Sequence, residues 1–468
     1  MAGVSASGLG SGLDVNGIIK QLMALEQQPM KALATKEAGF QAKLSSFGML
    51  KGALASLQTA AKTLSTTGTF TGMSASVSDT SVLTASAGST AAAGSYSLSV
   101  TQLAKFHAVR SNTNYAATTD TFTTGTLAIS IGGGTAKNIT IDSSNNTLAG
   151  IRQAINDADA GVTAAIINDG STNRLVLSSK TSGSAGAIAV AVTDSGSGGT
   201  HALGDLKSTG AGTTLVATQT ADDAKLTING IEITRSSNTI TDAIEGVTLS
   251  LTKGTLASPG TTSLTVTKNT GATAAAIGAF VKAYNDAVTQ LKNSSAYDAA
   301  NKRASTLTGD STVRSIQSQL GDLVQSSLTG ISGGIARLSD IGITVQANGT
   351  LAVDNTKLNA ALADRNMDVG ALFTQTTTGN TGIAVRFTAA LEAMVGTGGL
   401  IGSRTDGISA SIKDLGKRAE ALNLRLAAIE KRYRAQFTSL DSLVSGMNKT
   451  SQFLTQQLAN LPGASSSR

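Results

Sequence analysis

A long apolar repeat near the C-terminus organises this chain, and its clearest part is residues 408–437, ISASIKDLGKRAEALNLRLAAIEKRYRAQF. Apolar side chains recur there in alternating steps of four and three, at Ile408, Ile412, Leu415, Ala419, Leu422, Leu426, Ile429 and Tyr433. These steps form the heptad pattern of a helix that packs along one seam. The pattern therefore predicts a long helix whose apolar stripe needs a partner helix.

The repeat continues towards the C-terminus after one irregular step. Phe437 follows Tyr433 by four residues, and the alternation then resumes at Leu440, Val444, Met447, Ser451, Leu454, Leu458 and Leu461. A second step of four is a stutter, which locally unwinds a supercoil. Because this segment contains no proline before Pro462, we expect one continuous helix from Ile408 to Leu461.

The other end of the chain supplies a candidate partner helix. One predicted stripe consists of Val15, Ile18, Leu22 and Leu25, and a helical pattern of apolar residues continues to Leu64. Asp14 stands at the N-cap position before this run, and Pro29 predicts a break within it. Two interpretations remain open: the ends close an internal coiled coil, or they are exposed for polymerisation.

The composition limits the kinds of site that this chain can hold. Its 468 residues suffice for two to four domains, but it has no Cys and only two histidines, His107 and His201. Disulfides and thiolate metal sites are excluded, and two histidines so far apart in sequence do not indicate a metal site. The net charge is +6, and acidic residues are interspersed with the basic ones of the C-terminal helix. This mixture favours a solvated helix face over a nucleic-acid-binding patch.

Neither a membrane span nor a secretory signal peptide is expected. No apolar run is long enough to cross a bilayer, so we expect no membrane insertion. Residues 1–12 lack a basic start and an apolar core, and therefore do not resemble a signal peptide. Because this segment is rich in Gly and Ser, we expect it to be unstructured until it is bound.

Between the terminal helices the apolar period changes to two, which indicates β-strands. Hairpins are predicted around the three glycines at 132–134, at Asn229-Gly230 and at Asn348-Gly349, and Asp354 or Asn355 is expected to cap a short helix. Helical patterns return from about residue 270. The Gly/Ser-rich segment 194–200 is predicted to be a mobile loop, and 396–402 a glycine-rich link.

This order predicts an α+β multidomain chain, in which terminal helices form coiled-coil legs and a helical body, with β-rich domains inserted between them. The expected domains are a leg of residues 1–42 with 420–468, a helical body of 43–72 with 271–419, an inner β-rich domain of 73–125 with 237–270, and an outer β-rich domain of 126–236.

The sequence shows no constellation of residues typical of catalysis. The glycines at 8–12 lack the spacing of a dinucleotide fingerprint, and no strand precedes them. The adjacent Asp222 and Asp223 would point to opposite faces of a strand, so they do not support paired acid–base chemistry. We therefore expect neither an enzyme nor a cofactor.

Motifs near both termini resemble one family. Residues 7–15 read SGLGSGLDV, with IIKQLM at 18–23, and look like the N-terminal motif of the bacterial flagellar filament cap proteins, also called hook-associated protein 2. Near the other end, Arg432-Tyr433, Gln436-Phe437 and the stretch MNKTS at 447–451 resemble the C-terminal motif of that family. The middle matches at 229–248 and 338–354, whereas about 124–223 carries little of the family pattern beyond its β character.

The resemblance implies a secreted homo-oligomer, a ring at the distal tip of the flagellum, which promotes folding and insertion of flagellin subunits and prevents their loss. Members of this family leave the cell through the flagellar export apparatus. The implied partners are flagellin, the hook-filament junction proteins and a dedicated export chaperone at the C-terminal helix. The implied contacts for flagellin or self-association lie on the terminal helices, at Val15, Ile18, Leu22, Leu25, Tyr433, Phe437, Leu440, Val444, Met447 and Leu454.

Two other classes of protein fit the same pattern. Hook-filament junction proteins and flagellin also pair terminal helices around β insertions, and the β domains would alternatively serve as an adhesin presented at the filament tip. A stoichiometry measurement separates a cap, which forms one ring per filament, from flagellin, which forms a long polymer. Binding of glycans or host surfaces by residues 73–268 would favour the adhesin.

Overall fold

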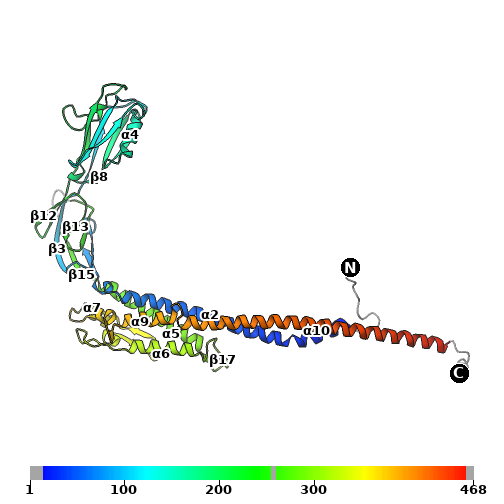
Figure 1. Cartoon of the computed structure of the whole chain (residues 1–468). Helices are drawn as coiled ribbons and strands as arrows, with labels where there is room; N and C mark the ends of the chain where they lie inside the picture. The colour runs from blue at the N-terminus through cyan, green and yellow to red at the C-terminus, as the bar shows by residue number, and fades with distance from the viewer. Residues whose placement is uncertain (1–13, 255–259, 460–468) are drawn as a thin grey trace. The chain divides into compact units, whose positions relative to one another are not determined.

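The computed structural model describes residues 14–254 and 260–459 and confirms an α+β multidomain fold. The described chain forms two compact units (Figure 1): a helical unit, which runs up to Thr69 and continues from Ala272, and a β-rich unit from Phe70 to Gly271. The β-rich unit is thus an insertion within the sequence of the helical one. The expected Gly/Ser-rich start at 1–12 and the last seam residue, Leu461, lie outside the described residues.

Long helices make up most of the helical unit. They are α1 (Val15–Glu26), α2 (Gln28–Leu64), α5 (Thr270–Ser295), α6 (Ser311–Gln325), α9 (Ile383–Val395) and α10 (Leu400–Ala459), and α3 (Gly68–Thr71) is a short helix at the unit boundary. Shorter elements are η3 (Leu338–Ile341), α7 (Asn355–Ala363), α8 (Val369–Thr374), β16 (Tyr297–Asp298), β17 (Arg303–Ala304), β18 (Ile343–Val345), β19 (Leu351–Val353), β20 (Thr376–Thr377) and β21 (Asn380–Thr381).

The C-terminal half of α2 lies in the core of the helical unit, because its apolar residues recur on one face. Phe47, Leu50, Leu54 and Leu57 are fully buried, and α2 packs against α9 and α10. The helices α2 and α10 run in opposite directions along each other (Figure 1). This pairing joins the two ends of the chain, as the apolar stripes require.

The predicted break near Pro29 is confirmed. Helix α1 ends at Glu26, α2 begins at Gln28, and Pro29 lies in the first turn of α2, where the missing N–H of proline costs no helical hydrogen bond. Asp14 caps α1 as predicted, because its Oδ1 accepts a hydrogen bond from the N–H of Gly17 at 2.9 Å.

The hairpin predicted at Asn348-Gly349 is also confirmed. Strands β18 and β19 pair antiparallel, and Gly349 has a φ of 81°, which favours glycine. Asn285 of α5 holds the hairpin: its amide donates to the Leu351 carbonyl at 2.9 Å and accepts from the Leu351 N–H at 2.7 Å. Asp354 caps α7, as expected.

Helix α10 begins at Leu400, inside the segment 396–402 that composition predicts to be a link. Two contacts stabilise these additional turns. Ile401 is fully buried, and the guanidinium of Arg404 donates from Nε and Nη2 to Oδ2 of Asp310 at 3.1 and 2.8 Å. Because Asp310 is the N-cap of α6, this ion pair ties the start of α10 to the helical core.

One helical stretch, Ile383–Leu458, contains an 18-residue window of mean hydropathy 1.2, which by length and composition alone is apolar enough to cross a membrane. Within α9, Phe387, Leu391 and Met394 are fully buried in the helical unit. Of that window, 33% is buried inside the structure, and because core helices pass the same test, a single such stretch is weak evidence for a membrane span.

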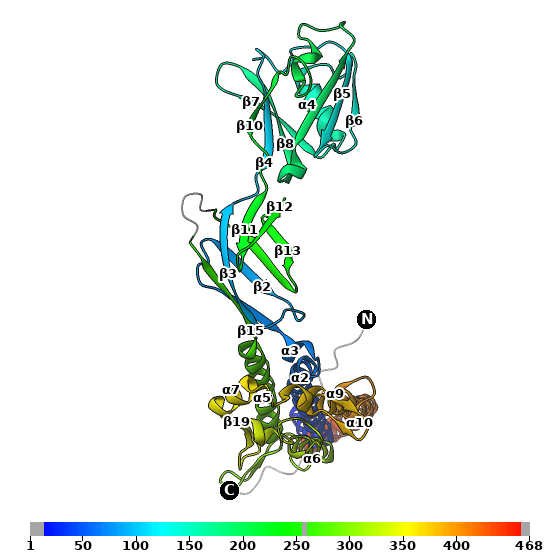
Figure 2. The same ribbon diagram turned by 90° about the vertical axis from the view of Figure 1, so that its left-hand side faces the viewer.

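The inner sandwich of the β-rich unit consists of two antiparallel sheets over one apolar core (Figure 2). Their strand orders are β1-β15-β3-β11-β12 and β13-β14-β2. The strands are β1 (Met73–Val77), β2 (Leu83–Ala87), β3 (Gly94–Gln102), β11 (Ala224–Ile228), β12 (Ile231–Arg235), β13 (Thr239–Ile244), β14 (Val247–Leu251) and β15 (Thr262–Lys268). Asn229 and Gly230 connect β11 to β12 with φ of 51° and 81°, which confirms the predicted two-residue turn.

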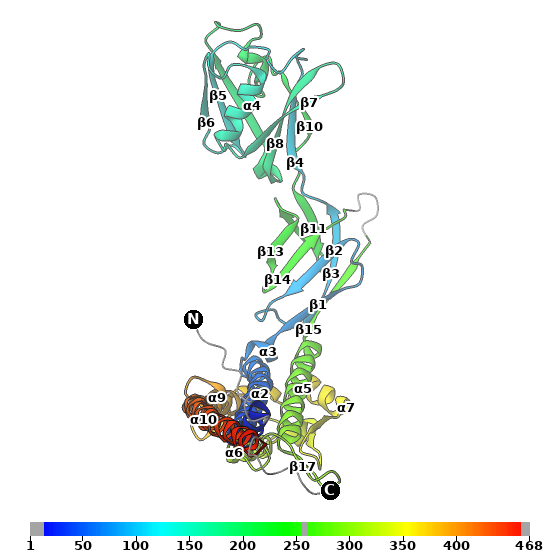
Figure 3. The same cartoon turned by 90° about the vertical axis from the view of Figure 1, so that its right-hand side faces the viewer.

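The outer sandwich has sheets of order β10-β4-β8-β7 and β6-β5-β9, and helix α4 belongs to its core (Figure 3). Its elements are β4 (Phe106–Ser111), β5 (Gly125–Ile131), β6 (Lys137–Ile141), α4 (Leu148–Asp157), β7 (Val162–Asn168), β8 (Asn173–Ser182), η1 (Ser184–Gly186), β9 (Ile188–Asp194), η2 (Leu203–Leu206) and β10 (Leu215–Gln219). The hairpin predicted around residues 132–134 is present, because β5 and β6 pair antiparallel.

The predicted boundaries between the inner and outer β-rich domains lie at 125/126 and 236/237. The residues of the two apolar cores do not divide at these positions. Val109, Tyr115 and Phe122 lie in the outer core, whereas Ala224, Leu226 and Ile228 lie in the inner one. Each core therefore extends past the predicted boundary. Whether each predicted range folds as an independent domain stays a prediction.

The segment 194–200 is tied to the outer sandwich, in contrast to the mobile loop that its composition predicts. The N–H of Thr124 donates to the Ser197 carbonyl at 2.8 Å, and the Asn146 amide donates to the carbonyls of Phe122 and Gly198 at 2.8 and 2.9 Å. A Cβ on Gly199 would lie 2.0 Å from the carbonyl carbon of Phe122, so only glycine fits this close approach. The partners are distant in sequence, and local composition does not reveal them.

We expect the β-rich unit to fold as a separate fragment of residues 70–271. Strands β1 and β15 pair from Met73↔Lys268 to Val77↔Leu264, so a strand pair joins the two ends of the fragment. The purified fragment should give a β-sheet circular dichroism spectrum and a cooperative thermal transition. A random-coil spectrum would contradict this separation of the units.

Substitution Arg404→Ala should destabilise the helical unit, because only 5% of the Asp310 side chain is exposed and its carboxylate would lose its charged partner. We expect a loss of about 1–3 kcal/mol in the free energy of unfolding at pH 7, measured by urea denaturation. Arg418→Ala is the matched control: its partner Asp414 is 56% exposed, so a loss below about 0.5 kcal/mol is expected.

The effect of Arg404→Ala should also depend on pH. Burial raises the pKa of Asp310, but hydrogen bonds from Arg404 and from the Thr312 N–H outweigh burial and lower the pKa below its usual value. A carboxyl group with a depressed pKa contributes stability above its unfolded pKa and loses it as the pH falls through the folded pKa. The difference in the free energy of unfolding between the unchanged protein and Arg404→Ala should therefore shrink as the pH falls into the acid range. A difference that stays constant down to pH 3 would contradict the role assigned to this ion pair.

Candidate functional site

Helix α1 packs against the middle of α10 through a small apolar cluster. Its buried residues are Val15, Ile19 and Met23, and they meet Leu426 and Ile429 of α10. Around them, the partly buried residues are Met30, Leu422, Tyr433 and Phe437. The cluster joins the first described helix of the chain to the last one.

The stripe that α1 buries differs from the predicted stripe. Val15 belongs to both, but Ile18 and Leu22 are half-buried and Leu25 is 71% exposed. The sequence contains adjacent apolar residues at 18–19 and at 22–23, so spacing alone does not identify the inner face. Packing on α10 selects Ile19 and Met23.

The seam of α10 is confirmed as far as Phe437. Its buried members are Ile408, Leu415, Leu426 and Ile429, and its half-buried members are Ile412, Ala419, Leu422, Tyr433 and Phe437. Helices α2 and α1 are the partners that cover it. The steps of four and three therefore identified the correct face of this helix.

Beyond Phe437 the stripe loses its cover within the described chain. None of the described side chains from 438 to 458 is buried, and Leu440, Met447 and Leu454 are 46%, 63% and 54% exposed. Val444 is half-buried and Leu458 is exposed. We call these five residues the tail stripe. An apolar stripe of this length on a helix is typical of an interaction surface.

The end of the cover coincides with the start of α1. Arg434 reaches Asn16 near that start, with 3.3 Å between Nη1 and Oδ1, and pairs with Glu430 at 2.8 Å. The guanidinium of Arg432 lies 5.7 Å from the ring centre of Tyr433, whose hydroxyl is 3.4 Å from Glu26 Oε1. Charged groups thus surround the α1–α10 cluster, and the tail stripe continues past them.

The ten predicted contact residues therefore lie in different environments. Val15, Tyr433 and Phe437 belong to the α1–α10 cluster or pack against it. Ile18, Leu22 and Val444 are half-buried, and the exposed ones are Leu25, Leu440, Met447 and Leu454. The structure brings the first group together and leaves the last group available to a partner.

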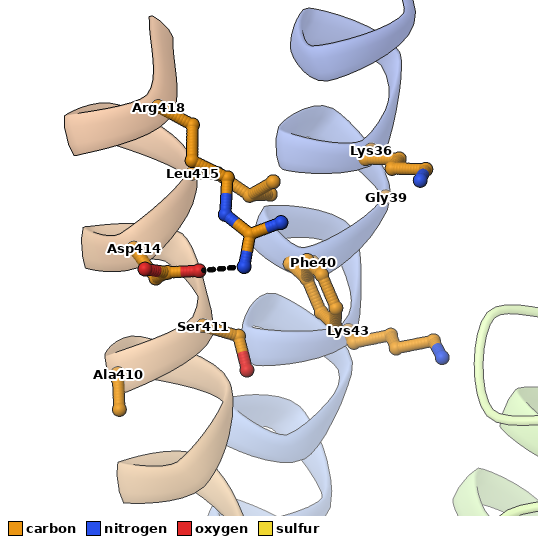
Figure 4. Close-up of a pocket in the computed structure, with 9 residues that line it drawn as sticks. All are labelled: Lys36, Gly39, Phe40, Lys43, Ala410, Ser411, Asp414, Leu415 and Arg418. Atoms are coloured by element: carbon orange, nitrogen blue, oxygen red, sulfur yellow. Dashed lines mark ion pairs between the residues drawn. The ribbon is translucent and has the colours of Figure 1, made fainter. Parts of the chain in front are cut away.

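A groove between α2 and α10 has no counterpart among the predicted sites (Figure 4). It has a volume of about 660 Å³, and the residues that line it are Lys36, Gly39, Phe40, Lys43, Ala410, Ser411, Asp414, Leu415 and Arg418. Phe40 and Leu415 lie between the two helices, and Arg418 pairs with Asp414 at 2.8 Å. Both apolar residues belong to periodic stripes, but a stripe does not show which of its members stay partly uncovered.

The two histidines and the adjacent Asp222 and Asp223 each contact other groups of the protein. His107 accepts a hydrogen bond at Nδ1 from the Ile188 N–H at 2.8 Å, and burial lowers its pKa. His201 lies 3.6 Å from an Asp120 carboxylate oxygen and packs on the ring of Tyr115. Asp222 pairs with Lys105, and Asp223 accepts from Ser184. No group of three potential ligands for a metal ion occurs among the residues that the structure describes.

Models of one family match both ends of the chain. The model for the flagellar hook-associated protein 2 C-terminus matches residues 221–449, and the model for its N-terminus matches residues 11–107. A flagellin hook IN motif matches residues 126–181, where the sequence shows little of the cap pattern.

Similar proteins align over nearly the whole chain. Flagellar hook-associated protein 2 of Escherichia coli K12 is 36% identical over 98% of this chain and 99% of its own length. The A-type flagellar hook-associated protein 2 of Pseudomonas aeruginosa is 34% identical over 98% of each. The crystal structure of the D1-D2-D3 domains of the flagellar cap protein FliD from Escherichia coli matches with a TM-score of 0.64 and 34% identity, covering 78% of this chain and 99% of that one.

Substitutions at Leu426 and Leu440 should separate the covered part of the seam from the tail stripe. Leu426→Asp places a carboxylate in the α1–α10 cluster, which costs several kcal/mol, so α1 should detach. Leu440→Asp on the exposed part should leave α1 in place. Hydrogen–deuterium exchange of residues 15–26 in dilute monomer measures this, and equal exchange in both variants would contradict the assignment.

Proposed function

This chain belongs to the flagellar hook-associated protein 2 family, the flagellar cap proteins, and we propose that it forms an oligomeric ring at the distal tip of the filament. In this position the ring promotes the folding and insertion of flagellin subunits and prevents their loss. The similarity over 98% of the chain, terminal helices included, supports this role over that of a junction protein or an adhesin alone.

The tail stripe is the observation that carries the proposed mechanism. Leu440, Met447 and Leu454 repeat every seven residues on one face of α10, and all are exposed. A heptad stripe in water gains free energy by packing on another helix, at roughly 25 cal/mol for each Å² of apolar surface removed from water. A helix of flagellin or of a neighbouring cap subunit would supply such a surface.

We assign different roles to the ten contact residues. Leu25 and the tail stripe members Leu440, Val444, Met447 and Leu454 make the contacts with flagellin or with neighbouring copies. Val15, Tyr433 and Phe437 hold α1 against α10 and so fix the direction of the tail. Ile18 and Leu22, which are half-buried on α1, complete the contact set.

Export through the flagellar apparatus and a dedicated chaperone belong to the same proposal. An uncovered apolar stripe is an aggregation hazard in a cell, and a chaperone that binds α10 near its C-terminal end would cover it before export. Hook-filament junction proteins are the proposed partners when the ring first forms. None of these roles requires catalysis or a cofactor, and we propose none.

In a strain that lacks its own cap gene, the chain with Leu440→Asp and Met447→Asp should fail to support filament growth. Because the two carboxylates oppose burial of the tail stripe, the cap should not attach, and flagellin should appear unpolymerised in the medium. Electron microscopy of cells and flagellin immunoblots of the medium provide the measurement.

The matched control is Leu424→Asp, which adds a carboxylate to the same helix at an apolar residue that is 72% exposed and outside the stripe. It should support filaments of normal length. If the double variant also gave normal filaments, the tail stripe would not be the attachment surface.

A further inference from the structure

The N-terminal half of α2 is covered on one side only. None of residues 28–45, all of them in the described chain, is buried, and its apolar members Met30, Leu33, Phe40 and Leu44 are half-buried. On α10, the facing Leu415 is buried, but Ser411 and Ile412 are half-buried. Two helices that cover each other incompletely leave a groove of the shape that a third helix fills in a bundle.

The groove itself combines an apolar centre with cationic edges (Figure 4). Phe40 and Leu415 form the centre, and Gly39 beside them faces open space, because a Cβ there would meet no atom within 4 Å. Lys36 and Lys43 stand on the α2 edge, and neither forms an ion pair with a described carboxylate. The Nζ of Lys43 lies 5.9 Å from the ring centre of Phe40.

The α10 edge of the groove also carries a cation, but a carboxylate partly neutralises its charge. Arg418 is 68% exposed and pairs with Asp414, the single carboxylate among the groove residues. Two lysines therefore remain uncompensated beside the apolar centre. A partner that places an apolar residue on Phe40 and Leu415, with carboxylates on its flanks, would satisfy both features.

We propose that this groove binds an acidic amphipathic helix of another protein. A second copy of this chain is a poor occupant, since its long terminal helices are cationic like the site and neither of the two is acidic: α2 carries five Lys and one Glu, and α10 carries nine Lys and Arg against five Asp and Glu. The groove lies beside the covered part of the α10 seam and uses none of the tail stripe residues. It therefore adds a second contact surface of different chemistry to the helical unit.

Two synthetic helical peptides test the proposal with the full-length protein. Both have Leu at heptad positions a and d over three heptads; one has Glu at e and g, and the other has Lys there. Fluorescence anisotropy should show binding of the Glu peptide, weakened by salt, and at least tenfold weaker binding of the Lys peptide. Failure of the Glu peptide to bind the unchanged protein would overturn the proposal.

Charge reversal locates the binding. The double variant Lys36→Glu with Lys43→Glu should weaken binding of the Glu peptide by roughly tenfold or more and strengthen binding of the Lys peptide. The matched control reverses two lysines of the same helix outside the groove, Lys51→Glu with Lys62→Glu, and should bind as the unchanged protein does. Equal effects of the two double variants would show that net charge, and not the groove, attracts the peptide, and would overturn the assignment.

Two further measurements distinguish other occupants. Leu440→Asp should retain Glu-peptide binding; its loss would place the peptide on the tail stripe and refute the groove. Vesicles of neutral lipid with 25% anionic lipid should not displace the Glu peptide. Displacement of the Glu peptide from the unchanged protein by these vesicles would identify the groove as a membrane-surface contact and overturn the proposal of a helix.

Discussion

A helix of sixty residues with one apolar stripe gains most of its stability where another surface covers that stripe, which in α10 is the part up to Phe437. In this protein the cover comes from the opposite end of the chain. Helix α2 packs along the first part of α10, and α1 packs on its middle through Val15, Ile19 and Met23. Because the two ends lie together, the β-rich unit from Phe70 to Gly271 is an insertion, and the chain returns to the helical unit at Ala272.

Much of this arrangement could be predicted from the sequence, because several features depend on local chemistry. Asp14, Pro29 and Asp354 mark helix boundaries by capping and by the missing N–H of proline. Asn229-Gly230 marks a turn because both residues tolerate a positive φ. The heptads from Ile408 to Tyr433 identify the inner face of α10, since every step there alternates between four and three along one seam.

The features that sequence reasoning missed depend on partners distant in the chain. Ile18 and Ile19 are chemically alike, and only the position of α10 decides which is buried. Residues 194–200 have the composition of a free loop, yet Thr124 and Asn146 bind them. The groove beside Phe40 could not be predicted for a related reason, since periodicity shows which face of a helix is apolar but not how completely a neighbouring helix covers it. The ten predicted contact residues share one apolar pattern, but they differ in exposure because neighbouring helices cover only some of them.

The strand pair of β1 and β15 has a consequence for how this protein tolerates change. Met73 and Lys268 are partners in one ladder, so the chain leaves the helical unit and returns to it at neighbouring points. The entropy of closing a loop grows only with the logarithm of its length, and here strand pairing already holds the two ends together. Insertions in the loops between these strands should therefore cost the helical unit little, because the strand pair keeps the two crossing points of the chain together.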